Sequence, residues 1–353
     1  MSKIVVVGGG IAGIAFIREF EKFDLKNEII LVEPKDYLEA PYGMLRALAD
    51  PVNFGKKVRR RIKDLIDAKQ IFSKVVELKK DSVILENGDS INFDYCIVAT
   101  GTSLNGFSAL KMRENQTKKD RDIQWRGLAK QLKASSNVAI IGGGVVGVEL
   151  AGEIKDFYKD KNVTLYNRED RLIDSMSPSS SQRALNILQK LGVDVKLNSP
   201  SSVEKREKNR VVVKEKEQEV EYNIVYETFG NKFEVDFAKK EFSDAIDENN
   251  QFITNEYLQL KEYKNIWVIG DINNIEKIKL GFLATKQAKL TALNLYREIK
   301  HKKIKKYKKM KGTLSLITIG RKHGIAQLPF GRFDMLVKYK QKKNLFVDET
   351  LNW

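Results

Sequence analysis

Two glycine-rich segments in this chain of 353 residues have the spacing that binds a dinucleotide. The glycines are Gly8, Gly10 and Gly13 in the first segment and Gly142, Gly144 and Gly147 in the second. In such a motif the first glycine permits a tight turn, the second lets the backbone approach a pyrophosphate, and the third lets a helix pack on the preceding strand. The helix N-terminus then presents free N–H groups to the phosphates. Two copies, each between an apolar run and a helical stretch, predict two dinucleotide sites.

The residue that ends the next strand differs between the two copies. Glu33 ends the run Glu28–Glu33, 20 residues after Gly13, where a carboxylate accepts hydrogen bonds from an adenosine ribose. The alternative is a solvated acid at a strand end. In the second copy Arg168 ends the corresponding run, and an arginine there suits a ribose 2′-phosphate. This favours NADPH over NADH, although the neighbouring Glu169 weakens the inference.

More of the chain converges on the first site than on the second. The run Phe93–Gly101 predicts a strand that ends in a turn, and Asn265–Asp271 predicts another strand that ends in Gly-Asp. Asp271 is suited to bind a ribityl hydroxyl. Two different dinucleotide sites in one chain indicate a hydride relay from a nicotinamide to a flavin, and we assign the flavin to the first site.

The elements that must position these residues are parallel strands and crossover helices, so we predict an α/β fold with two nested Rossmann-like domains. Residues 1–112 and 247–300 form the predicted FAD domain, and residues 113–246 form the NAD(P)H domain inserted into it. The FAD domain includes a small meander with a hairpin at Asn87-Gly88. Residues 301–353 form a short C-terminal α+β module.

The order of these motifs resembles the two-dinucleotide flavoprotein (glutathione-reductase-like) family. Within it, the chain is most similar to the apoptosis-inducing-factor-like branch, which includes the ferroptosis suppressor proteins. The segments that carry the closer resemblance are Leu45-Arg46-Ala47, Lys279-Leu280-Gly281-Phe282, Gly320–Gln327 and the ending Asn344-Leu345-Phe346…Trp353. The resemblance implies an enzyme with FAD that takes hydride from NAD(P)H and reduces a quinone at a membrane surface.

The resemblance also assigns individual residues. The FAD contacts that it implies are Gly8, Gly10, Gly13, Glu33, Arg46, Gly101 and Asp271, with the backbone of Val76 near the adenine and that of Leu280 near the isoalloxazine. The nicotinamide-dinucleotide contacts are Gly142, Gly144, Gly147, Glu149 and the Gly230 loop.

Two charged side chains are the candidates for a catalytic role. Glu149 lies in the first turns of the second crossover helix, where it would orient the nicotinamide or hold the flavin N5 region, and the alternative is an acid that complements the helix dipole. Lys279 precedes a predicted helix whose free N–H groups would stabilise negative charge on the reduced flavin. The alternative for Lys279 is a surface charge.

The composition limits the electron acceptors that are possible in the second half of the reaction. The chain has one cysteine, Cys96, so thiol–disulfide transfer within the chain is excluded. With only two histidines a cysteine/histidine zinc site is not expected either, and we predict no metal. The electron acceptor must therefore reach the flavin directly, which favours a quinone or another small molecule.

The formal charge of +16 predicts an anionic partner. Eight lysines stand in Lys300–Lys311, and a second basic run covers residues 54–63. Such runs attract anionic membranes at about 1 kcal/mol per basic residue. The alternative is a solvated face, since lysines outnumber arginines.

The sequence also gives a predicted location and two other functions. We expect a cytoplasmic protein that is peripheral on a membrane, because the chain shows no signal peptide, no transmembrane run and Ser2 in place of a myristoylation glycine. One alternative function is a flavin-bound signalling or nucleic-acid-binding protein. The other is a ferredoxin or monodehydroascorbate reductase.

Overall fold

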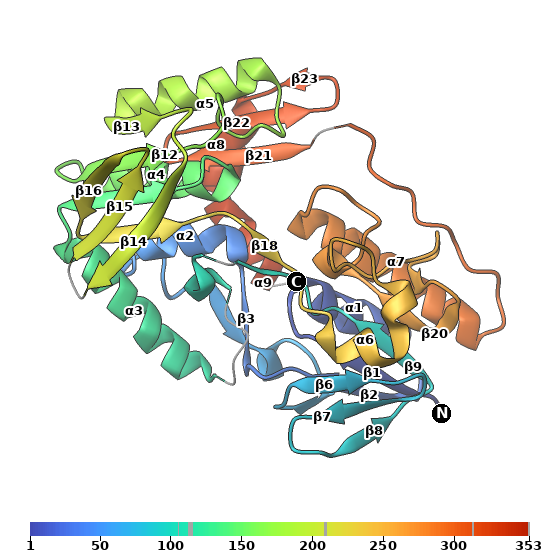
Figure 1. Cartoon of the computed structure of the whole chain (residues 1–353). Helices are drawn as coiled ribbons and strands as arrows, with labels where there is room; N and C mark the ends of the chain where they lie inside the picture. The colour runs from blue at the N-terminus through green and yellow to red at the C-terminus, as the bar shows by residue number, and fades with distance from the viewer. Residues whose placement is uncertain (105, 112–115, 208–209, 313, 352–353) are drawn as a thin grey trace.

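The computed structural model describes residues 1–104, 106–111, 116–207, 210–312 and 314–351 (Figure 1). Two parallel sheets dominate this part of the chain, and helices cover their faces. The predicted α/β fold with two nested Rossmann-like domains and a C-terminal α+β module is confirmed.

The first sheet gathers strands from both ends of the chain. Its order is β19-β20-β9-β1-β2-β5, and every neighbouring pair is parallel except β19 with β20. The bounds are β1 Lys3–Val7, β2 Glu28–Val32, β5 Lys69–Ile71, β9 Tyr95–Val98, β19 Gln259–Leu260 and β20 Tyr263–Val268. Helices α1 (Ile11–Glu21) and α7 (Gly281–Ile299) pack against each other on one face.

The central strand β1 is buried on both faces, as its unbroken apolar sequence predicts. Ile4 and Val6 belong to the hydrophobic cluster on the side of α1 and α7, whereas Val5 and Val7 belong to a separate cluster on the opposite side. All four side chains are at most 4% exposed. The glycine loop that follows β1 therefore extends from one of the most rigid parts of the fold.

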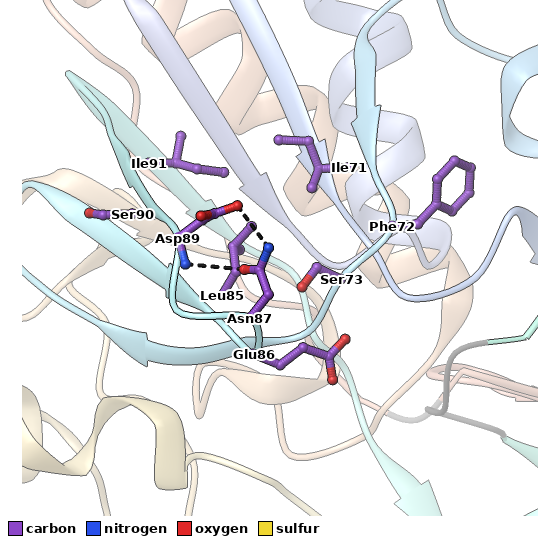
Figure 2. Close-up of a pocket in the computed structure, with 9 residues that line it drawn as sticks. All are labelled: Ile71, Phe72, Ser73, Leu85, Glu86, Asn87, Asp89, Ser90 and Ile91. Carbon is purple, nitrogen blue, oxygen red and sulfur yellow. Dashed lines mark hydrogen bonds between the residues drawn. The ribbon is translucent and has the colours of Figure 1, made fainter.

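A small antiparallel meander covers the opposite face of the first sheet. It consists of β6 (Val75–Leu78), β7 (Ser82–Leu85) and β8 (Ser90–Asn92), and the predicted hairpin at Asn87-Gly88 is confirmed. Gly88 takes a positive φ of 88°, and the Asn87 amide hydrogen-bonds the Asp89 carboxylate across the turn. A hollow of about 420 Å³ lies beside this hairpin. Figure 2 shows the side chains that line it, and none of them belongs to a predicted site residue.

Helix α6 (Asp236–Phe242) also belongs to this side of the first sheet. It packs on β6, and its Ala238 and Phe242 lie in the same cluster as Val5 and Val7. The sequence boundary at residue 247 assigned this helix to the nicotinamide domain. The packing favours a boundary that precedes Asp236.

The second sheet repeats the arrangement of the first on a smaller scale. Its order is β13-β12-β11-β17, all parallel, with β11 Asn137–Ile141, β12 Asn162–Tyr166, β13 Val193–Lys196 and β17 Ile224–Glu227. Its helices are α3 (Lys118–Ala134), α4 (Val145–Phe157) and α5 (Pro178–Leu191). An antiparallel layer of β14 (Ser201–Glu207), β15 (Arg210–Glu215) and β16 (Gln218–Tyr222) flanks it.

Short elements connect these layers. Strands β3 (Tyr37–Glu39) and β4 (Arg59–Arg61), which precede and follow helix α2 (Pro41–Ala49) in the chain, pair with each other. Strand β10 (Ser103–Leu104) pairs with β18 (Asn231–Lys232). The short 3₁₀ helices are η1 Ile62–Asp64, η2 Ser108–Leu110, η3 Ser243–Ala245 and η4 Gly270–Ile272.

The C-terminal module reaches the second sheet by an extended lysine-rich segment. From the end of α7, residues 300–311 run back along that helix, and Asn294 on α7 exchanges hydrogen bonds with the backbone of Lys305. The module contains β21 (Ser315–Ile319), β22 (His323–Leu328), β23 (Gly331–Arg332), α8 (Met335–Lys342), η5 (Asn344–Phe346) and α9 (Val347–Leu351). Strands β21 and β22 pack on α4 and α5 respectively.

Helix α4 and the end of strand β21 approach each other closely at Gly152, which has no side chain. A Cβ atom on Gly152 of α4 would lie 2.8 Å from the Gly320 nitrogen and 2.7 Å from the Ile319 Cγ2 atom. Gly320 has a positive φ of 64°, and a Cβ there would lie 2.7 Å from the Asp156 Cβ. The module therefore packs closely on α4 at two positions, Gly152 and Gly320, that leave no room for a side chain of their own.

We expect Gly152→Ala to lower the free energy of unfolding by about 1–3 kcal/mol, because the added methyl group overpacks this contact. Gly127→Ala is the matched control, since Gly127 lies inside α3 and a Cβ there would meet nothing within 4 Å. The control should raise stability by about 0.5–1 kcal/mol, the usual gain for alanine in a helix. Urea unfolding of the two variants measures both changes in the free energy of unfolding. Equal changes in the two variants would contradict the close contact at Gly152.

Candidate active site

The glycines of the first loop differ in their surroundings: Gly13 packs against the backbone, whereas Gly10 borders open space. A Cβ on Gly13 would lie 2.0 Å from the Gly8 carbonyl oxygen, so the loop and α1 touch through their backbones. Gly8 itself has a positive φ of 104°. At Gly10, in contrast, a Cβ would meet nothing within 4 Å. The middle glycine thus borders space that a pyrophosphate would fill, as its role in the motif requires.

The second loop reproduces this geometry. Gly142 has a φ of 115°, a Cβ on Gly147 would lie 1.9 Å from the Gly142 oxygen, and Gly144 again borders open space. The loop after β17 joins it, because the Thr228 hydroxyl donates to the Gly142 oxygen at 3.0 Å. Gly230, with a φ of 76°, stands in that same loop. The structure therefore joins the loop that contains Gly230 to the second glycine loop through Thr228.

The helices that begin at these loops are not capped by side chains. Neither Gly10 before α1 nor Gly144 before α4 supplies a side-chain hydrogen bond, and neither first turn contains an acid. Helix α7, preceded by Leu280, has the same features. By contrast, Thr117 caps α3 and Ser177 caps α5. The N–H groups of α1, α4 and α7 are thus left for a ligand.

Several of the predicted flavin contacts gather at the N-terminus of α1. A Cβ on Gly270 would lie 3.1 Å from the Ala12 Cβ, and one on Gly281 would lie 3.2 Å from the Ile11 Cδ1. The N-terminus of α7 and the Gly-Asp turn therefore both lie beside the first glycine loop. The Gln287 side chain on α7 fixes this turn by accepting a hydrogen bond from the Gly270 N–H at 2.7 Å.

Glu33 is buried beside the first loop, where its carboxylate accepts a hydrogen bond from the Gly9 N–H at 2.6 Å. The equivalent place in the second half belongs to Asn167, whose Oδ1 accepts from the Gly143 N–H at 3.0 Å. The equivalence follows from register, since Val7 pairs with Val32 as Ile141 pairs with Tyr166.

Sequence inspection singled out Arg168 and passed over Asn167. The Arg168 side chain is 80% exposed, and its Nε donates to the Glu169 carboxylate at 3.0 Å. The signal for Asn167 was its position directly after the strand, which matches that of Glu33. A neutral amide now occupies the place where a carboxylate would repel a 2′-phosphate.

Asp271 and Gly101 flank the flavin side of the site. The Thr102 hydroxyl donates to the Asp271 carboxylate at 3.3 Å, and the Lys111 ammonium lies 3.7 Å from it. Gly101 has a positive φ of 65°, and a Cβ there would meet nothing within 4 Å. Val76 lies on β6, beside an irregularity in strand pairing, with its side chain 51% exposed.

Lys279 is held just before α7 rather than extended into solvent. Its ammonium donates to the Asn273 carbonyl oxygen at 2.6 Å. Burial lowers the pKa of this amine, although the nearby Asp271 carboxylate acts in the opposite direction. These contacts argue against the alternative that Lys279 is merely a surface charge.

Glu149 is buried against the C-terminal module. Its Oε1 accepts hydrogen bonds from the Thr318 N–H at 3.0 Å and from the Thr318 hydroxyl at 3.1 Å. The Lys340 ammonium lies 3.6 Å from the same oxygen. Within the described part of the chain, Oε2 accepts no hydrogen bond. Glu149 therefore has a rigid orientation and one oxygen left to bind a ligand.

Arg46 lies in a buried ion pair with Glu153. Its guanidinium donates from Nε and NH2 to that carboxylate, at 2.7 Å for the shortest contact, and NH2 also donates to the Gly320 oxygen at 3.3 Å. Burial raises the pKa of Glu153, and the hydrogen bonds from Arg46 oppose that shift. The sequence assigned Arg46 to the flavin but gave no sign of this second partner.

Glu149, Glu153 and Asp156 thus form an acidic stripe on successive turns of α4. The third member accepts two hydrogen bonds from Arg321, one from its backbone N–H at 2.8 Å and one from its Nε at 2.9 Å. Burial acts to raise the pKa of Asp156, but the Arg321 and Lys159 contacts outweigh it and hold that pKa below the ordinary value. The acidic stripe binds the FAD-side helix α2 and the C-terminal module to α4.

The single cysteine lies away from this chemistry. Cys96 is fully buried in β9, and burial raises the pKa of its thiol. Among the described residues no group of three or more histidine, cysteine or acidic side chains is placed to hold a metal ion.

The fold and the two glycine loops define a class of protein, the two-dinucleotide oxidoreductases. A family model described as pyridine nucleotide-disulphide oxidoreductase matches residues 2–288, and the chain belongs to this family.

The chain is also similar to individual relatives and solved structures. The chain is 31% identical to ferroptosis suppressor protein 1 of Xenopus tropicalis, over 99% of this chain and 94% of the relative. It is 26% identical to apoptosis-inducing factor homolog B of Dictyostelium discoideum, over 99% and 96%. The fold is similar to that of the sulfide:quinone oxidoreductase of Aquifex aeolicus, with a TM-score of 0.76, 18% identity and coverage of 100% and 92%. It is also similar to NDH2 of Plasmodium falciparum in complex with NADH, with a TM-score of 0.73, 16% identity and coverage of 98% and 97%.

We expect Asp156→Asn to lower the free energy of unfolding at pH 7 by about 1 kcal/mol, the scale of one well-formed ion pair. Because the folded-state pKa of Asp156 is depressed, the pair stabilises the protein above pH 3.8, the ordinary value, and this contribution is lost as the pH falls further. Urea unfolding between pH 7 and pH 3 should therefore show that the difference in free energy of unfolding between wild type and Asp156→Asn becomes smaller below pH 4. Asp244→Asn, which removes the exposed pair with Lys261, is the control and should change little at any pH. A difference between wild type and Asp156→Asn that stays constant with pH would contradict the depressed pKa of Asp156.

Proposed function

We propose that this protein takes hydride from NAD(P)H onto bound FAD and passes electrons to a quinone at a membrane surface. The observation that carries the proposal is the pair of open glycine cradles, at Gly10 and Gly144, each at an uncapped helix N-terminus. Two such cradles in one chain are suited to two dinucleotides. When bound, FAD supplies the redox chemistry that no side chain of the protein offers.

The chain's own groups hold and orient the two ligands. At the first cradle, the N–H groups of α1 face the pyrophosphate, while Glu33 and Asp271 are placed to accept hydrogen bonds from ribose and ribityl hydroxyls. The uncapped N-terminus of α7, with Lys279 beside it, offers positive potential to the ring edge where negative charge develops. Leu280 carries the last backbone N–H before that helix.

At the second cradle the N–H groups of α4 face the nicotinamide dinucleotide, with Gly230 across the loop. Glu149 lies in the first turns of the same helix, where its unengaged oxygen can accept a hydrogen bond from the carboxamide. Asn167 in the ribose position supports NADPH over NADH, and the exposed Arg168 is free to turn toward a 2′-phosphate once it leaves Glu169.

The presence of a single cysteine in the chain supports the quinone part of the proposal. One buried cysteine cannot relay electrons as a dithiol. The similar sulfide:quinone oxidoreductase is named for a quinone.

The membrane part of the proposal is supported by two surfaces. The C-terminal module exposes five large apolar side chains: Phe330 in the turn between β22 and β23, Phe333 after β23, and Met335, Leu336 and Tyr339 on α8. The rings of Phe330 and Phe333 contact each other, with their centroids 5.3 Å apart. Phe330 and Met335 are 77% and 80% exposed. The extended segment 300–311 adds exposed lysines that attract anionic lipid. In the described part of the chain, no helix has the length and hydropathy that crossing a bilayer requires.

We expect Gly10→Ala to reduce flavin retention at least tenfold while the apoprotein keeps its stability. A Cβ at this position meets no protein atom but occupies the space proposed for the pyrophosphate, and the backbone there is in the extended region that alanine adopts freely. Flavin absorbance after gel filtration and urea unfolding of the apoprotein measure the two effects. Gly13→Ala is the contrast, because its clash with the Gly8 backbone should destabilise the apoprotein itself. Full flavin retention in Gly10→Ala would refute the cradle.

The proposed reaction is tested by anaerobic stopped-flow on the flavoprotein. Reduction by NADPH should be faster than by NADH, and a short-chain ubiquinone should then reoxidise the flavin rapidly. If the flavin bleached but only ferredoxin reoxidised it, a ferredoxin reductase would replace the proposal. If no acceptor reoxidised it and duplex DNA bound with a steep salt dependence, a nucleic-acid-binding role would replace it instead.

A further inference from the structure

A strongly basic hollow lies on the outside of the molecule, where strand β4 and the 3₁₀ turn after it meet helix α3. Its volume is about 550 Å³. The residues that line it are Arg59, Arg60, Arg61, Asp64, Lys118, Lys119, Asp122 and Arg126. None of the residues of the two glycine loops lines it, and the proposed function gives it no role.

The cations of this basic hollow exceed what its own carboxylates neutralise. Six of the eight lining side chains are basic and two are acidic. Asp122 is already engaged, by Arg59 at 2.9 Å and by Lys118 at 2.8 Å. Four bases, Arg60, Arg61, Lys119 and Arg126, are exposed, and their side chains make no ion pair or hydrogen bond with any described residue.

The floor of the basic hollow is rigid, which distinguishes it from a set of mobile surface charges. Arg59 is 3% exposed, and it shares the Glu39 carboxylate with the fully buried Arg121. Both guanidinium groups lie over the Trp125 ring, at 5.4 Å and 4.8 Å from its centroid. A buried network therefore fixes β4 against α3 and sets the spacing of the exposed cations above it.

The N-terminus of α3 adds to the positive potential. Lys118, Lys119 and Arg126 all belong to this helix of 17 residues, and the first two stand in its first turn. The positive end of the helix dipole lies beside Lys118 and Lys119, and Thr117 and Asp120 at the same end partly satisfy it. A concave surface that carries several like charges focuses the field and attracts a multiply charged anion.

From the excess of cations around one hollow, and not from the capped N-terminus of α3, we propose that this basic hollow binds a ligand with several clustered phosphate groups. Arginine favours phosphate because its planar fork donates two parallel hydrogen bonds to phosphate oxygens. Arg60, Arg61 and Arg126 supply three such forks around one cavity, whereas segment 300–311 has lysines only on an extended surface. An oligophosphate, free or as a phosphorylated lipid headgroup, matches the charge excess and the volume.

The test is titration calorimetry with sodium tripolyphosphate on the flavoprotein, in saturating NADP⁺ so that both dinucleotide sites, including the proposed 2′-phosphate contact, are filled. Wild type should bind one equivalent, and Arg60→Gln/Arg126→Gln should weaken the affinity at least tenfold. The matched control is Lys303→Gln/Lys309→Gln, which removes the same charge from exposed positions of segment 300–311 and should change the affinity less than twofold. Unchanged flavin absorbance and unfolding midpoint show that the variants are folded.

Two results would overturn the proposal. One is the absence of saturable binding to wild type. The other is equal weakening in the two double variants, which would reduce the effect to net charge. Binding to vesicles with and without a phosphoinositide then identifies the source of the phosphates. If the ligand is a lipid headgroup, tripolyphosphate should release the protein from phosphoinositide vesicles. If the ligand is a free oligophosphate, tripolyphosphate should leave the binding of the protein to vesicles unchanged. Turnover with NADPH and ubiquinone is measured separately, so failure of this site leaves the proposed reaction untouched.

Discussion

Contact between helix α4 and the C-terminal module is the constraint on which the relative positions of the other parts depend. Gly152 lets α4 approach Ile319 and Gly320 closely, and Glu149 and Asp156, which lie on either side of Gly152 along α4, form ion pairs with Lys340 and Arg321 of the module. Glu153 extends the connection to α2 through Arg46, so one helix joins the flavin side, the nicotinamide side and the module. Helix α4, whose N-terminus is proposed to bind one ligand, is thereby fixed at its other turns by partners from two distant parts of the chain.

The elements around the glycine loops could be predicted because local sequence determines them. A run of apolar residues before Gly8 or Gly142 specifies a strand buried on both faces, and the spacing of the glycines specifies the turn and the helix packing. The hairpin at Asn87-Gly88 is equally local, because glycine adopts the positive φ that its turn requires. These features need no knowledge of distant residues.

The parts that could not be predicted involve long-range partners. Nothing in the sequence around Arg46 indicates Glu153, which lies 107 positions away, and nothing around Glu149 indicates Thr318 and Lys340. Asn167 was missed for a different reason, because an arginine is a stronger chemical signal than an amide. The buried role of Arg59 within a basic run was hidden in the same way, since composition alone does not separate a core guanidinium from a solvated one.

The backbone contact at Gly152 and Gly320 also limits how this architecture varies in evolution. A gap filled by side chains can be refilled by a different combination of side chains, but a close approach at two glycines leaves no room for a side chain at either position. The C-terminal module and this turn of α4 must therefore change together or not at all. A relative that acquires a different C-terminal module has to acquire a different surface on its nicotinamide-side helix, so recombination between such proteins is restricted to breakpoints that keep the pair intact.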